Sequence, residues 1–151
     1  MNDAPVLICY DGSEESRHAI HGAARVLGPR RAVVLDVGPL LTAAESLVAT
    51  APVAPTAAFE QLNAADALRR AEAGAERARA AGFAAEARGE AAGPTWEAIV
   101  DVADELDAAV IVLGSRGLNG ARELMDESVS HQVARHAGRP VLIVPAANGH
   151  H

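Results

Sequence analysis

One stretch of the chain restricts the possible folds more than any other. Residues 110–113 are apolar and mostly β-branched, in a run too short for a helix, so they predict a buried strand. Gly114, Gly117 and Gly120 follow at intervals of three. Glycine lets a backbone turn sharply and approach a ligand closely. A helix is then expected to begin within residues 126–128.

A strand, a glycine-rich loop and a helix N-terminus in this order suit an anion, because free N–H groups and the positive end of the helix dipole point at one spot. Arg116 within the loop is a candidate partner for phosphate charge, whereas Arg122 is expected on the surface. Ser128 and Ser130 offer hydroxyl groups at the helix start. Two simpler interpretations stay open: a βα turn that only needs positive φ, and serines that only cap the helix.

Apolar runs alternate with helical patterns along the whole chain, which indicates an α/β fold with a doubly wound parallel sheet. The strands are expected at residues 5–10, 32–37, 83–88, 109–113 and 141–144. In the strand order 3-2-1-4-5, the first and fourth strands lie side by side. Asp11 and Gly12 would then face the Gly114 loop across one crevice, at the carboxyl ends of the strands where such sheets bind ligands.

The remaining segments fit a single domain over residues 1–151. Residues 38–56 are rich in Pro, Ala, Thr and Ser, and we expect a flexible flap near the crevice. Residues 57–81 are dominated by Ala, Glu, Arg and Leu, which predicts a long helix with a solvated charged face. A loop is expected over residues 89–95, and the last helix over residues 126–137.

The composition restricts the function. The net charge of -7 disfavours a nucleic-acid or anionic-membrane partner. All 13 basic residues are Arg, so a phosphate loop that requires Lys is absent. The single cysteine, Cys9, allows no internal disulfide and is expected to be a buried structural thiol. With neither a signal peptide nor a spanning segment in view, the pattern favours the cytoplasm.

Three further features have a possible functional interpretation. Asp11 is either a turn carboxylate that binds nearby backbone N–H groups or a ligand-binding residue. The acidic residues on the helix near Trp96 form either a solvated face, which we favour, or a metal site. The histidines, among them His18 and His131, permit a Ser/His/Asp hydrolase, but no nucleophile elbow is visible.

A family resemblance extends over most of the chain, from about Pro5 to Pro145. The chain resembles the universal stress protein family, whose signature is G-2x-G-9x-G-[S/T]. Gly114 and Gly117 match its first two positions and Ser128 its last, but Glu127 stands where the family has its third glycine. Asp11-Gly12-Ser13, Gly93-Pro94 and the apolar residues 140–145 also agree with the family pattern.

The resemblance implies an adenine nucleotide alpha-hydrolase-like fold, which is a three-layer α/β/α sandwich, and ATP as the ligand. Asp11 would face the adenine and ribose, and Val37 would hold the adenine through its backbone. The implied nucleotide-binding residues are Asp11, Gly12, Val37, Gly114, Arg116, Gly117, Ser128, Val129 and Ser130. The resemblance also implies a homodimer in which residues Val141 to Val144 pair with their own copy.

Glu127 leaves the ligand question open. Its carboxylate would repel a triphosphate, so ATP would bind weakly or with Mg²⁺ as a bridge. Alternatively, the side chain points to solvent and changes little. The leading hypothesis is a stress-response regulatory protein that binds adenine nucleotide and hydrolyses it slowly at most. The alternatives are an interaction protein of the same fold without nucleotide, and a small-molecule hydrolase or transferase.

Overall fold

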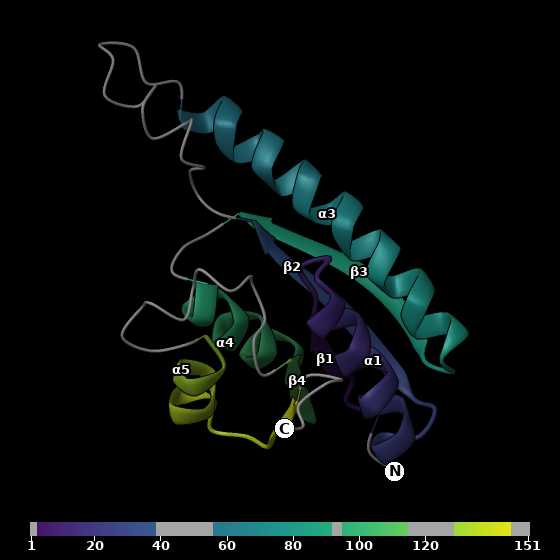
Figure 1. The fold of residues 1–151 in the computed structure, drawn as a ribbon. Helices are drawn as coiled ribbons and strands as arrows, with labels where there is room; N and C mark the ends of the chain where they lie inside the picture. The colour runs from purple at the N-terminus through teal and green to yellow at the C-terminus, as the bar shows by residue number, and fades with distance from the viewer. Residues whose placement is uncertain (1–2, 39–55, 92–94, 115–128, 146–151) are drawn as a thin grey trace, which may run out of the picture.

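The computed structural model describes residues 3–38, 56–91, 95–114 and 129–145, and for residues 56–63 it describes the backbone alone. The elements, shown in Figure 1, are β1 (Val6–Cys9), α1 (Glu14–Leu27), β2 (Arg31–Gly38), α3 (Thr56–Ala80), β3 (Ala84–Ala91), α4 (Thr95–Leu106), β4 (Val110–Gly114), α5 (Val129–His136) and β5 (Val141–Val144). Strands and helices alternate, as the sequence predicts. Residues 39–55, within the predicted flap, lie outside the described residues.

The five strands form one sheet in the order β3-β2-β1-β4-β5, and every pair is parallel. This confirms the predicted order. The central strand β1 pairs with both β2 and β4, so that Val6 lies opposite Ala32 on one side and Val110 on the other. The chain switches direction across the sheet between β1 and β4, and ligands of such sheets bind at this point.

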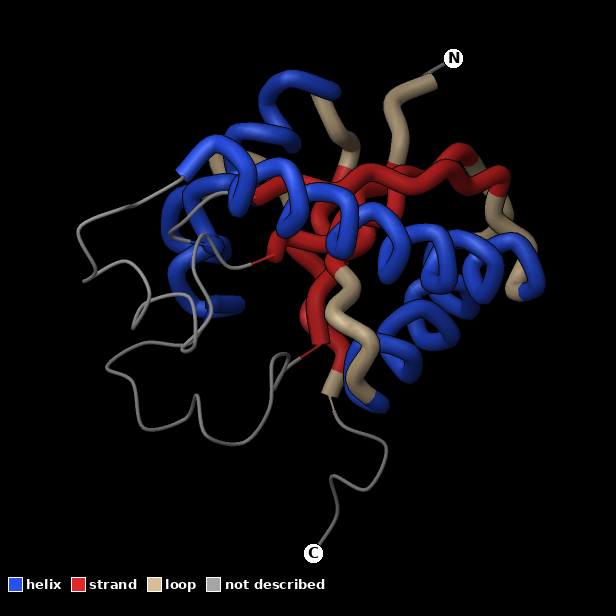
Figure 2. The backbone as a smooth tube through the Cα atoms, turned by 90° about the horizontal axis from the view of Figure 1, so that it is seen from above, coloured by secondary structure: helices blue, strands red, loops and turns tan. Residues whose placement is uncertain are grey.

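Helices cover both faces of the sheet, and Figure 2 shows the strands enclosed between them. α1 and α3 pack on one face, in a core that contains Val6, Ile8 and Ala23. α4 and α5 pack on the other face, in a core that contains Leu7 and Ile99. Successive residues of β1 therefore enter different cores, which explains why the strand is apolar throughout.

The core has few aromatic residues and relies on close backbone approach instead. Along α3, the residues that face the sheet are small, and Ala67, Ala71, Ala75 and Ala78 are fully buried. Gly74 of α3 has no room for a Cβ, which would lie 2.8 Å from the ring of Tyr10. α3 can therefore pack close to β2 and β3. The many dispersion contacts of this close packing make up for the smaller apolar area that alanine and glycine bury.

The third strand differs from its predicted bounds of 83–88. Phe83 precedes the strand and is buried, while Gly89, predicted to start a loop, lies inside β3. At Gly89 the backbone of α3 crosses the strand so closely that no side chain fits. Gly89 allows a close helix–strand contact here. In the sequence, a glycine with this role looks the same as a glycine in a turn.

The helix ends follow the predicted signals. Ser13 caps α1, its hydroxyl oxygen accepting a hydrogen bond from the Ser16 N–H at 3.1 Å. Gly28, with φ of 73°, closes the helix by donating its N–H to the Ala24 carbonyl. Of the helix predicted at residues 126–137, the structure describes Val129–His136, and residues 126–128 lie outside the described part.

The acidic residues of α4 and the turn after it are exposed, as the favoured interpretation predicts. Two of them form ion pairs: Glu105 with Arg88 of β3 at 2.8 Å, and Asp104 with Arg139 at 2.7 Å. Within the described residues, no group of three or more His, Cys, Asp or Glu is placed to hold a metal ion. The described helices also include none with the length and apolar character that a membrane crossing needs.

Candidate functional site

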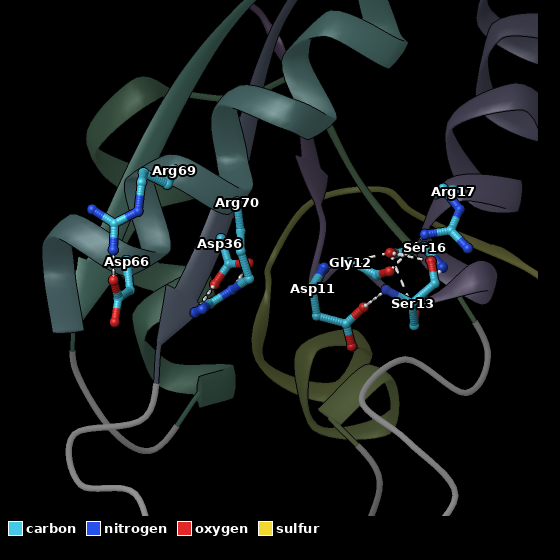
Figure 3. Close-up of polar contacts among 9 residues, drawn as sticks. All are labelled: Asp11, Gly12, Ser13, Ser16, Arg17, Asp36, Asp66, Arg69 and Arg70. Atoms are coloured by element: carbon cyan, nitrogen blue, oxygen red, sulfur yellow. Dashed lines mark hydrogen bonds and ion pairs between the residues drawn. The ribbon is translucent and has the colours of Figure 1, made fainter.

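Asp11 lies two residues after Cys9, the last residue of β1, at the carboxyl end of the central strand. Its Oδ1 accepts a hydrogen bond from the Ser13 N–H at 2.9 Å, which makes the turn into α1. Gly12, between them, has φ of 85°, which favours glycine. The hydrogen bond to Ser13 is the one that the turn-carboxylate interpretation predicts, and the ligand-binding role of Asp11 stays a prediction. The same hydrogen bond holds the carboxylate at the edge of the sheet, as Figure 3 shows.

The turn after Asp11 is held by a second set of contacts. Arg17 donates a hydrogen bond from Nη1 to the Gly12 carbonyl at 2.7 Å. Ser16 is buried, and its hydroxyl donates to the Ser13 carbonyl at 2.9 Å. Because both contacts come from the first turn of α1, the loop and the helix N-terminus form one rigid unit beside Asp11.

Gly114 ends β4, the strand next to β1. A Cβ at Gly114 would lie 3.0 Å from the carbonyl oxygen of Glu15, so β4 ends against the first turn of α1. Since Ile8 and Val112 are register partners, Gly114 at the end of β4 and Asp11 after β1 lie at neighbouring strand ends. The structure thus places the carboxyl ends of the first and fourth strands side by side, as the sequence predicts.

Val37 lies near the end of β2, on the other side of β1. Leu35 is the register partner of Cys9, and the Tyr10 N–H donates to the Leu35 carbonyl at 2.9 Å. The strands therefore stay paired up to the residue before Asp11. The side chain of Val37 packs against the core beneath α4 and α5. The side chain of Val37 therefore belongs to the core, and the adenine-binding role that the resemblance implies belongs to its backbone.

The residues predicted on the glycine loop are described only in part. Arg116, Gly117 and Ser128 lie outside the described residues, as does Glu127. Val129 and Ser130 begin α5, and Val129 packs against the same core as Val37. Of the predicted site, the structure therefore describes the β1, β2 and β4 ends and the first turn of α5.

Asp36 and Arg70 form an ion pair at this edge that sequence reasoning missed. Arg70 of α3 donates from Nε to Oδ2 at 2.9 Å and from Nη2 to Oδ1 at 3.0 Å. The Asp36 side chain is 2% exposed and that of Arg70 is 41% exposed. A charged residue within the apolar run 32–37 was the available signal, since a buried carboxylate needs a partner.

Burial dominates the electrostatics of this pair. It raises the pKa of the Asp36 carboxyl above its ordinary value, against the hydrogen bond and charge of Arg70, which lower it. The pKa of Arg70 is raised, mainly by the hydrogen bond to Asp36. Desolvation of the Asp36 carboxylate outweighs the attraction of Arg70, because the carboxylate is almost fully enclosed and the guanidinium is not.

The cysteine and several histidines of the described residues lie in environments that the structure defines. Burial raises the pKa of the Cys9 thiol, and the charges of Asp11 and Asp36 raise it further, so the thiolate is disfavoured. His136 stacks on Trp96, with ring centroids 4.6 Å apart. His18 and His21 line a groove of ≈ 410 Å³ between α1 and β5. The interpretation of Cys9 as a structural thiol is the one that its environment favours.

Comparisons with known proteins identify the family of this chain. The sequence profile described as the universal stress protein family matches residues 4–145. Universal stress protein YxiE from Bacillus subtilis is 32% identical over 147 residues, which cover 92% of this chain and 97% of YxiE. The chain belongs to the universal stress protein family.

Solved structures share the fold. The structure of hypothetical protein MJ0577 superposes with a TM-score of 0.75 at 20% identity, covering 99% of this chain and 100% of that one. A universal stress protein crystallised in complex with cAMP has a TM-score of 0.62 at 27% identity, covering 97% of this chain and 100% of that one. The predicted three-layer α/β/α sandwich is therefore confirmed.

Proposed function

We propose that this chain is a regulatory protein that binds an adenine nucleotide in the crevice between the ends of β1 and β4. The observation that carries the proposal is the position of Asp11, held by Ser13 at the end of β1 beside the strand that ends at Gly114. The related protein bound to cAMP, at 27% identity over nearly all of this chain, supports the same ligand class. The family resemblance favours ATP.

The ligand would lie across the ends of the three central strands. Asp11 would accept hydrogen bonds from the ribose or adenine, and the backbone of Val37 would hold the adenine. Gly114, with Arg116, Gly117 and Ser128 assigned from the sequence, would surround the phosphates. Gly12, Val129 and Ser130 complete the proposed site, because N–H groups at a helix start attract anions.

Calorimetric titration of ATP, AMP and cAMP into the purified chain tests the proposal. We expect saturable binding of at least one of the three. Asp11→Ala should weaken it about tenfold, because a hydrogen bond to a charged group contributes about 1.5–3 kcal/mol. Asp101→Ala, which removes an exposed carboxylate of α4, is the control and should bind as the wild type does. Binding of none of the three nucleotides would refute the proposal.

We also propose a homodimer in which the free edges of two β5 strands pair. β5 is the last strand of the sheet, and Ile143 is 39% exposed on it. Val26 of α1, 68% exposed, lines the adjacent groove together with Ile143. An apolar strand edge with exposed apolar neighbours favours pairing with another chain.

Other sequence-based expectations stay predictions. They are the role of Mg²⁺, hydrolysis that is slow at most, a single domain over residues 1–151, a cytoplasmic location and the absence of a nucleic-acid partner. Removal of Mg²⁺ with a chelator during the ATP titration tests the first of them. A metal bridge at Glu127 requires that affinity for ATP falls with the chelator while affinity for adenosine does not.

A further inference from the structure

The ion pair of Asp36 and Arg70 fixes one edge of a guanidinium at the end of the sheet where the proposed site lies. The pair is bidentate and uses Nε and Nη2 of Arg70, at 2.9 and 3.0 Å. The carboxylate that holds it is 2% exposed and belongs to a strand of the sheet. A planar guanidinium bound in this way has little freedom to rotate. The pair itself leaves Nη1 and its two hydrogens for another acceptor.

The position of this pair links it to the ligand crevice. Asp36 directly precedes Val37, whose backbone belongs to the proposed site, while the two side chains point to opposite faces of the sheet. β2, which carries Asp36, stays paired with the chain up to Tyr10, the residue before Asp11. Figure 3 shows Asp11 and the ion pair at the same end of the sheet, with Arg70 reaching down from α3. The charge of Asp11 also raises the pKa values of both Asp36 and Arg70, so the three groups share one electrostatic environment.

The charge balance decides which part of a nucleotide fits here. Asp36 compensates the charge of Arg70, and Glu14 compensates that of Arg17 beside Gly12, so the carboxylate of Asp11 is left as the uncompensated charge among these groups. A triphosphate would be repelled, whereas an uncharged nucleoside with ring nitrogens and ribose hydroxyls would find both a donor and an acceptor. The phosphates would then lie toward β4 and α5.

We propose that Arg70, held by Asp36, is a specificity-determining residue that donates a hydrogen bond from Nη1 to an acceptor atom of the nucleoside. Asp36 acts through Arg70 and is a positioning residue. The inference rests on the proposed nucleotide site and adds to it a residue of α3, outside the family signature. A merely structural role would join α3 to β2 without any effect on ligand choice.

The test measures adenosine, ATP and tripolyphosphate binding to the wild type and to Arg70→Lys. Lysine keeps the charge but cannot donate through a rigid fork. We expect affinity for adenosine and for ATP to fall by the same factor, about tenfold for one charged hydrogen bond, while affinity for tripolyphosphate stays unchanged. A loss confined to ATP and tripolyphosphate would overturn the inference, because Arg70 would then contact phosphate.

Two further variants separate recognition from folding. Asp36→Asn keeps Arg70 but loosens its position, so adenosine affinity should fall while the melting temperature shows that the chain is folded. Arg88→Lys breaks the comparable bidentate pair with Glu105 on the opposite face of the sheet, and its nucleoside affinity should equal that of the wild type. Equal losses in Arg70→Lys and Arg88→Lys would overturn the inference.

The wild-type titration separates a failure of the proposed function from a failure of the role of Arg70. If the wild type binds neither adenosine nor ATP, the proposed function fails and the role of Arg70 fails with it. If the wild type binds both and Arg70→Lys binds them equally well, only the role of Arg70 fails.

Discussion

Gly89 of β3 lies directly beneath the backbone of Leu68 in α3. A Cβ at Gly89 would be 2.7 Å from the Leu68 Cα and 2.8 Å from the carbonyl carbon of Ala67. Real Cβ atoms do not approach backbone atoms so closely, so the helix can cross the strand here only over a glycine. This contact sets the height of α3 above the sheet and, with it, the reach of Arg70 to Asp36.

Gly89→Ala should destabilise the fold by about 1–3 kcal/mol, because an added methyl group forces backbone shifts in a packed region. Gly74→Ala is the matched comparison. A Cβ there would meet buried side-chain atoms of Tyr10 and Val34 instead of backbone, and alanine gains about 1 kcal/mol over glycine within a helix, which offsets part of the cost. Urea unfolding should therefore rank Gly89→Ala as clearly less stable than Gly74→Ala. The opposite ranking would contradict the packing described for α3.

The pH dependence of stability should carry the signature of Asp36. Because burial raises the pKa of this carboxyl in the folded state, the folded chain holds its proton more tightly than the unfolded chain. The contribution is fully present below the ordinary Asp pKa and is lost as pH rises through the folded pKa. The free energy of unfolding of the wild type, minus that of Asp36→Asn, should therefore fall from about pH 3.5 upward.

Urea unfolding of both proteins at several pH values between about 3.5 and 7 measures this difference. Asp101→Asn, at an exposed carboxylate of α4, provides the control for changes in net charge. A wild-type advantage that grows with pH would mean that the Arg70 hydrogen bonds outweigh burial, contrary to the electrostatics described for the pair.

Ile143→Glu should convert the proposed dimer into a monomer. The substitution places a charge on the exposed side of β5, where two strand edges would meet, and an unpaired buried carboxylate is strongly unfavourable. Light scattering at micromolar protein concentration should give the dimer mass for the wild type and half of it for the variant. Leu68→Glu, at an exposed position of α3, should leave the mass of the wild type unchanged.

Glu127→Gly should tighten ATP binding and leave adenosine binding unaltered. Removal of one like charge about 4 Å from a phosphate is worth about 1 kcal/mol in water, or roughly fivefold in affinity. Glu127→Gln removes the charge without restoring glycine, so calorimetry of both variants separates repulsion from backbone freedom. Equal ATP affinity in all three proteins would mean that Glu127 points to solvent.

The sheet order was predictable because five short apolar runs alternate with helical patterns, and few topologies satisfy that alternation. The position of the site was predictable for the same reason, because Asp11 and Gly114 lie at the carboxyl ends of two central strands. Local signals also sufficed at Ser13 and Gly28, where a cap and a stop act on adjacent residues.

The contacts that depend on distant packing were not predictable. Gly89 resembles a turn residue in the sequence, and only the crossing of α3 shows why no side chain is allowed there. Asp36 and Arg70 are 34 residues apart. Asp36 in an apolar run signals that a partner is needed, but the choice of Arg70 among 13 arginines depends on how α3 lies across β2.

The most direct test of the central claim is a map of amide chemical shifts in the ¹⁵N-labelled protein during titration with ATP. We expect saturable shifts that are largest at the residues of the proposed site, with β3 and its residue Arg88 unaffected. The residues are Asp11, Gly12, Val37, Gly114 and Ser130. Shifts confined to the groove between α1 and β5, or no saturable shifts at millimolar ATP, would contradict a nucleotide site between the ends of β1 and β4.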